Sequence, residues 1–289
     1  EIGSGLVGSE MCIRDRNIIA RQRGVFYCFF LLLGCVIFNY IHNLKRCSSL
    51  ERYMVPNYLN MSVFSYDNQY GIYILTFMAI LLVLPGGLSL AKDRKNRTDI
   101  LYVNRCGGYK NYYISKIAAV FTVTFVCFTV PFLIEIILNV CAFPNEASEE
   151  MRSVYQAYDK RNNVDGTGGT FWMCGIYYLY PGLYAVLRIV LTGLQAGLLS
   201  LVPLAVSCFY CKYQAYLLLP VYLMSVFWNN TTFKVFGHKI EHNYASYLTW
   251  GNTKLDTSDC IYFLIMVFTV ALVSVICMLI CAGRRENKR

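Results

Sequence analysis

KDRKNRTDILYVNRCGGYKNYYISK, residues 92–116, is the most basic stretch of the chain and lies between two long apolar segments. It carries seven Lys and Arg residues against two aspartates. Basic loops next to membrane spans are retained on the cytoplasmic side. The stretch therefore predicts a membrane protein and fixes the orientation of the spans on either side of it.

The composition also predicts a membrane protein. Of 289 residues, 56% are hydrophobic and only 15% are charged, and the mean hydropathy is +0.43. An ordinary soluble domain has about 25% charged residues. The net charge of +9 comes from Lys and Arg near the ends of apolar segments, where they set orientation and contact anionic lipid. We therefore expect membrane lipid as a partner and no nucleic acid.

Six segments with few or no charges are close to the length of a membrane-spanning helix. They cover residues 24–41, 71–91, 117–143, 182–207, 213–228 and 260–282. The parts of the chain that this trace places inside hold sixteen Lys and Arg residues, two of them within residues 1–16, whereas the outer loops hold nine. The predicted fold is all-α: one polytopic membrane domain with six transmembrane helices and both termini in the cytoplasm.

The first sixteen residues, EIGSGLVGSEMCIRDR, resemble the peptide obtained when sequencing-adapter DNA is translated. We therefore treat residues 1–16 as an artefactual peptide and leave them out of the fold prediction. The membrane domain is expected to cover residues 17–289.

A short helix is predicted inside the basic loop. Thr98 or Asp99 can cap its first turn, and the pair Gly107-Gly108 suits the left-handed conformation that ends a helix. A soluble partner could grip such a helix, although a solvated charged loop that only sets the topology fits the same composition. The helix and its turns comprise Arg97, Thr98, Asp99, Ile100, Leu101, Val103, Arg105, Gly107 and Gly108.

Pro85, Gly86 and Gly87 lie near the cytoplasmic end of the second predicted span. Proline removes a backbone donor and glycine relaxes steric limits, so a kink or break is expected there. A kink directly before the basic loop could act as a hinge. Gly and Pro also occur in membrane helices for packing alone.

Two ionisable residues, Glu135 and Arg188, fall inside the third and fourth predicted spans. Such groups are costly in a membrane unless they are paired or face water. Counting the helix rise places both roughly 9–12 Å below the outer surface. We hypothesise a buried ion pair that locks the two spans together; the alternative is that each side chain reaches separately toward the outer headgroups.

The sequence predicts no catalytic residue, cofactor or metal site. His238-Lys-Ile-Glu-His242 has the order of an inverted zinc-protease motif, but it lies in an outer loop beside Gly237 without a long helical frame or a further acidic ligand. Cys208-Phe-Tyr-Cys211 is a lone C-x-x-C pair. Because no Walker loop, Gly-x-Ser-x-Gly elbow or paired acids are found, the chain is not expected to be an enzyme.

Two regions carry a resemblance to a known family. The first is the run Ser89-Leu-Ala-Lys-Asp93 with its basic continuation, Gly107-Gly-Tyr-Lys110 and Lys116. The second is residues 197–207, followed by a short polar turn and Pro220. With the six segments in this order, residues 17–289 resemble the membrane subunit of ATP-binding-cassette transporters, the type-2 permease family. The family usually has an acidic residue followed by Gly in this loop, whereas here Asp93 is followed by Arg94.

This resemblance implies a permease subunit, expected to be an exporter in the bacterial cytoplasmic membrane. A separate ATPase subunit would dock on the helix from Thr98 to Arg105, within the loop 92–116, and a second permease would complete a homodimer or heterodimer. Closure of the nucleotide sites would tilt the second and fifth spans. The alternative is a non-transporting membrane sensor or immunity protein of permease shape, which needs no docking helix.

Overall fold

The computed structural model describes residues 19–50, 55–65, 68–87, 89–144, 172–173, 176, 179–209, 219, 222–223, 232–235, 238–241, 247–248 and 257–287. These residues are mostly helical, which confirms the predicted predominance of α-helix.

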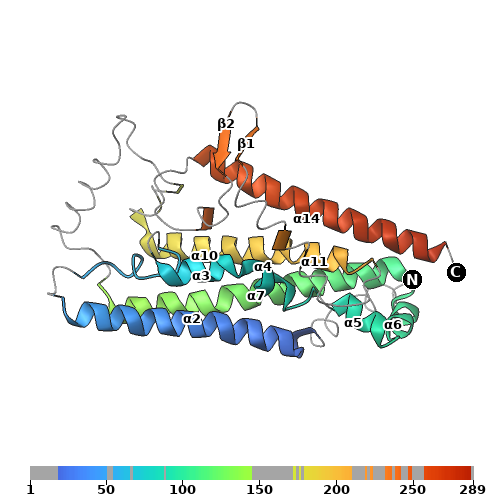
Figure 1. The fold of residues 1–289 in the computed structure, drawn as a ribbon, viewed down its shortest axis with the longest axis horizontal. Coiled ribbons are helices and arrows are strands. Elements are labelled where there is room, and N and C mark those ends of the chain that lie inside the picture. The colour runs from blue at the N-terminus through green and yellow to red at the C-terminus, as the bar shows by residue number, and fades with distance from the viewer. Residues whose placement is uncertain are drawn as a thin grey trace.

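Four helical segments are long and apolar enough to cross a membrane. They are α2 (Arg23–Ser48), α7 (Tyr109–Ala142), α10 (Pro181–Leu199) with its continuation α11 (Leu201–Val206), and α14 (Thr257–Glu286). Figure 1 shows α2, α7 and α10 running along the long axis of the molecule, with α14 inclined to them. They match the first, third, fourth and sixth predicted spans and indicate a membrane-embedded protein.

The second predicted span, residues 71–91, is not one continuous helix. The structure divides this region into α3 (Gln69–Thr76), α4 (Met78–Val83) and α5 (Ser89–Lys95). The interruption at residues 84–87 contains Pro85, which has no N–H to donate to a helical ladder. The fifth predicted span, 213–228, lies almost wholly outside the described residues, so four of the six predicted spans are found as long helices.

The basic loop gathers at one end of the molecule, shown at the right of Figure 1. There α5 and α6 (Asp99–Cys106) lie beside the first turns of α7 and the last turns of α14. Glu286 of α14 accepts a hydrogen bond from the backbone N–H of Lys110 at 3.3 Å, and its carboxylate lies 3.8 Å from the Lys110 Nζ. The carboxyl end of α14 is thereby joined to the start of α7.

Close helix packing depends on glycines that are four residues apart in α10. A Cβ added to Gly197 would lie 2.9 Å from the ring of Phe121, and one added to Gly193 would overlap Thr129 Oγ1. Gly-x-x-x-Gly spacing lets the backbones of two membrane helices approach closely. The spacing of Gly193 and Gly197 is visible in the sequence, but the predicted contact between these two spans was the Glu135–Arg188 ion pair.

A two-stranded antiparallel hairpin is the one sheet within the described ranges. β1 (Thr232–Val235) pairs with β2 (His238–Glu241), with Val235 opposite His238. The backbone from His238 to Glu241 is therefore extended. Extended backbone does not provide the successive helical turns that an H-x-x-E-H zinc site requires.

Candidate functional site

The short helix predicted in the basic loop is present as α6, between two turns of the same kind. Thr98 N donates to Asp93 O at the end of α5, and Gly108 N donates to Val103 O at the end of α6. Each bond closes a Schellman turn, which needs one residue in the left-handed conformation. That residue is Arg97 (φ 54°) after α5 and Gly107 (φ 73°) after α6. The predicted role of the Gly107-Gly108 pair in ending this helix is confirmed.

The predicted cap at the start of α6 differs in detail from the observed one. Thr98 is the N-cap residue, but its side chain does not cap the first turn. Its hydroxyl donates instead to the carbonyl oxygen of Asp93 at 3.2 Å, and Asp99 provides the acidic residue of the first turn. Thr98 therefore ties the start of α6 back to α5.

Asp93 lies at the centre of a buried polar cluster that joins α5 to α7. Its Oδ2 accepts a hydrogen bond from the Tyr112 hydroxyl at 2.8 Å and lies 3.0 Å from Lys116 Nζ. The Lys116 side chain is 1% exposed, and its ammonium also lies 5.6 Å from the centre of the Tyr102 ring of α6. A buried charge pair of this kind is strongly destabilised if one partner is removed. The cluster thus connects α5, α6 and α7.

Arg94 makes the second connection, from α5 to the end of α11. Its guanidinium donates to the carbonyl oxygens of Ser207 and Cys208 at 2.9 and 2.8 Å, and to the Tyr113 hydroxyl at 2.9 Å. Carbonyl groups at a helix end have no partner inside the helix, and a cation there is favourable. Through Arg94, the basic loop contacts the candidate span that contains α10 and α11.

α6 also has an exposed side, on which two apolar side chains lie next to Asn104 and Arg105. Ile100 and Leu101 are 50% and 59% exposed, whereas Val103 is fully buried. The basic residues divide in the same way: Lys92, Lys95, Arg97, Arg105 and Lys110 are exposed, whereas Arg94 and Lys116 hold the loop in place. α6 thus presents two adjacent apolar side chains within a basic surface.

The predicted hinge residues lie in a tightly packed turn. A Cβ added to Gly86 would lie 2.7 Å from Val120 Cγ2 of α7, and one added to Gly87 would lie 2.9 Å from Pro203 of α11. The glycines therefore allow the interrupted segment, including Pro85, to approach both helices. A break in the helix is present as predicted, and its role as a hinge remains a prediction.

The predicted ion pair between Glu135 and Arg188 is wrong, because each side chain has other partners. Glu135 Oε1 accepts hydrogen bonds from the backbone N–H of Val63 at 2.6 Å and from Asn39 Nδ2 at 3.0 Å, and Oε2 accepts one from Ser62 at 3.2 Å. Glu135 is 1% exposed, so it does not reach the headgroups either. It fastens the segment 55–65 between α2 and α7.

Arg188 is also enclosed by protein. Its guanidinium donates to the carbonyl oxygen of Tyr247 at 3.1 Å and to that of Leu248 at 3.5 Å, and it lies 5.0 Å from the centre of the Trp172 ring. Backbone carbonyls and an aromatic face thus surround this cation.

Sequence reasoning missed the asparagines that complete the Glu135 cluster. Asn39 and Asn43 of α2 both donate to the carbonyl oxygen of Met61, at 3.0 and 2.8 Å, and Asn68 donates to Asn39 Oδ1 at 2.8 Å. The available signal was the i, i+4 spacing of two asparagines at the end of an apolar segment, which puts both on one helix face.

The described residues contain no group of three or more His, Cys, Asp and Glu side chains that could hold a metal ion. Burial raises the pKa of the Cys208 thiol to about 11, although nearby Arg94 lowers it. The thiolate is the metal-binding and nucleophilic form, so Cys208 is poorly suited to either role. Comparison of the chain with protein-family models, curated proteins and solved structures finds no match.

Proposed function

We propose that this chain is the membrane-spanning permease subunit of an ATP-binding-cassette transporter, working as an exporter with a separate ATPase subunit docked on α6. The observation that supports the proposal is the exposed pair Ile100 and Leu101 on α6, a short helix that directly follows α5, and polar contacts hold α5 against two candidate spans. Exposed apolar side chains within a charged surface are typical of a protein interface.

The contacts around α5 and α6 would carry motion from the ATPase to the membrane. Lys116 and Asp93 connect the loop to α7, and Arg94 connects it to the end of α11. Because these are short contacts between buried or partly buried groups, a displacement of α6 would move the adjoining helix ends rather than be absorbed by a flexible loop. The helices therefore have the connection that energy coupling needs.

The same proposal assigns the location and the other partners. The basic loop would face the cytoplasm of a bacterial cell, in line with the excess of Lys and Arg at that end. The partner chain would hydrolyse ATP. α2 and α14 expose large apolar side chains such as Phe30, Phe38, Ile265 and Phe268, which suits contact with lipid and with a second permease in a homodimer or heterodimer.

The test is to purify the full chain from its native membrane with and without the double change Ile100→Asp, Leu101→Asp. The unchanged chain should co-purify with a protein that has a Walker loop and hydrolyses ATP. The double variant should insert equally well but lose that protein, because two charges replace the apolar contact.

Asn96→Asp is the matched control, since it adds a negative charge to the exposed turn before α6 without removing apolar surface. It should keep the ATPase bound. Retained ATPase binding by the double variant would remove α6 from the proposed mechanism. A chain that binds no ATPase in any form would favour the non-transporting sensor or immunity protein.

A further inference from the structure

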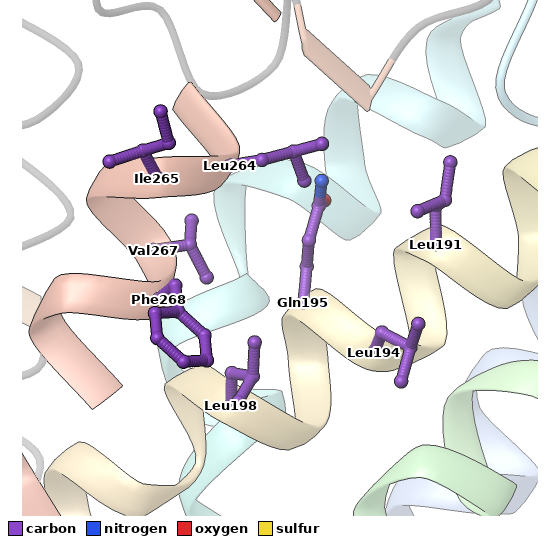
Figure 2. Close-up of a pocket in the computed structure, with 8 residues that line it drawn as sticks. All are labelled: Leu191, Leu194, Gln195, Leu198, Leu264, Ile265, Val267 and Phe268. Carbon is purple, nitrogen blue, oxygen red and sulfur yellow. The ribbon is translucent and has the colours of Figure 1, made fainter. Parts of the chain in front are cut away.

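A cavity of about 340 Å³ lies between α10 and α14 (Figure 2). Seven of the eight side chains that line it are apolar, and the eighth is Gln195. The cavity shares no residue with the polar cluster around Asp93 or with the exposed face of α6. Its volume falls within the range of about 300–1,000 Å³ that is usual for small-molecule sites.

Gln195 is an unusual side chain for this position. In Figure 2 it extends from α10 toward Leu264 of α14. The residue is 4% exposed, and its Oε1 is buried with no hydrogen-bond partner in the described part of the chain. A buried acceptor left in this state destabilises the folded protein. A water molecule is a poor partner for this oxygen, because a buried water makes two to four hydrogen bonds and the cavity offers one polar side chain.

The rim of the cavity is apolar and accessible. Leu194, Ile265 and Phe268 are 37%, 57% and 59% exposed, whereas Val267 on the inner side is fully buried. Both helices are candidate membrane spans, so the exposed rim faces the lipid and a ligand can enter sideways from the bilayer. None of the eight lining residues is charged, so an ionic headgroup would find no counter-charge.

The depth of Gln195 narrows the choice of ligand. In the span Pro181–Val206 it lies fourteen residues from the first and eleven from the last, which corresponds to about 21 and 16 Å along the helix. The headgroup of an ordinary phospholipid lies at the membrane surface and would not reach this depth. The group that bonds to Gln195 must belong to a molecule that dissolves in the apolar interior.

We propose that this cavity binds an uncharged, membrane-soluble molecule with an apolar chain and one hydroxyl or amide group, which forms a hydrogen bond with Gln195. A hydroxyl can both donate and accept, so it matches either end of the side-chain amide. The apolar chain fills the space between α10 and α14. This inference stands independently of the ATPase partner.

The test uses the full chain in lipid nanodiscs with Phe268→Trp as a fluorescent reporter at the rim. The reporter signal is the difference from the unchanged chain, which contains three native tryptophans. Bromohexanol, brominated at the end opposite its hydroxyl, quenches tryptophan on contact; bromohexane has the same chain without the hydroxyl. Bromohexanol should quench the reporter saturably and at about fivefold lower membrane concentration than bromohexane, since one hydrogen bond contributes about 1 kcal/mol.

Gln195→Leu in the reporter chain should abolish the preference for the alcohol. It should not impair folding, because it replaces a side chain whose buried oxygen has no hydrogen-bond partner with an apolar one. Leu198→Phe is a second variant, which narrows the cavity but keeps the amide, and should weaken binding of both probes. Ile276→Trp, an exposed position on the same helix, is the matched reporter and should show only linear, collisional quenching.

Two results would overturn the proposal. Equal quenching of the rim reporter by both probes would mean that the cavity accepts any apolar chain, such as a lipid tail. Linear quenching at position 268, indistinguishable from that at 276, would mean that protein fills the cavity, from this chain or from a second copy.

Discussion

Lys116 Nζ lies 3.0 Å from Asp93 Oδ2, with the lysine side chain almost wholly removed from solvent. This contact joins α5 to α7 where the basic loop returns to the apolar part of the chain. It also separates the basic residues of the loop into two kinds, because Lys116 and Arg94 are bound internally while five others are exposed.

Lys116→Met should destabilise the protein by about 3–5 kcal/mol, because it leaves the Asp93 carboxylate buried without its cation. The double change Asp93→Asn, Lys116→Met should recover much of this loss, since the remaining amide can still accept from Tyr112. Thermal unfolding in detergent micelles measures both effects. Equal stability of the single and double variants would contradict this account of the cluster.

Glu135→Ala should release the segment 55–65 from its place between α2 and α7. The change removes the acceptor of three hydrogen bonds, including that of the Val63 N–H, and leaves those donors buried at a cost of about 1–3 kcal/mol each. Limited proteolysis should then cut within this segment. Glu135→Gln, which keeps one acceptor oxygen, should be cut more slowly; equal rates would argue against a role for these bonds.

Exchanging the two buried charges should not restore stability. Glu135→Arg combined with Arg188→Glu should be no more stable than the poorer single variant, because the observed partners of these residues are different groups. The yield of folded protein after size-exclusion chromatography provides the measurement. Rescue by the double change would show that the two side chains do interact.

Gly86→Ala should cost about 1–3 kcal/mol through overpacking against Val120. Val120→Ala alone should also destabilise, because the valine is fully buried. The double variant should lose less stability than the two single losses combined, since the smaller side chain makes room for the new methyl group. Strict additivity of the measured unfolding free energies would exclude this contact.

Gly107→Ala should destabilise α6 by about 1–2 kcal/mol, because a left-handed conformation is unfavourable for a residue with a Cβ. No atom lies within 4 Å of the added methyl group, so the cost is conformational. Arg97 holds the equivalent left-handed position after α5. Arg97→Gly removes the Cβ there and should not destabilise the protein. Hydrogen exchange of the α6 amides distinguishes the two, and faster exchange in Arg97→Gly would refute the explanation.

Local signals predicted the long helices and α6 well. A run of apolar residues suffices to find α7 or α14, and the left-handed turn at Gly107 follows from the properties of glycine alone. The break near Pro85 was also expected, but the separate interruption at Phe77 has no counterpart in the residue pattern. A hydropathy average over many residues does not detect a break at one residue, so it predicts one continuous span.

The partners of buried charges could not be predicted in the same way. Helix rise placed Glu135 and Arg188 at a similar depth, but depth does not define which way a side chain points around its helix. It also gave no sign that the chain folds back, so that Val63 meets Glu135. The partner of Arg94 could not be predicted for a similar reason, since the carbonyl oxygen of Ser207 lies at the end of α11, more than a hundred residues away in the chain.

The glycine contacts between α7 and α10 have a mechanical consequence. Gly193 and Gly197 pack directly against the aromatic and threonine side chains of α7. The two helices should therefore behave as one rigid unit, in which neither helix slides or rotates against the other. The stretch that contains α3, α4 and α5 is, in contrast, divided into three short helices. Under the proposed function, a displacement of α6 would therefore move α7 and α10 together as one unit, while the breaks between α3, α4 and α5 allow that stretch to bend.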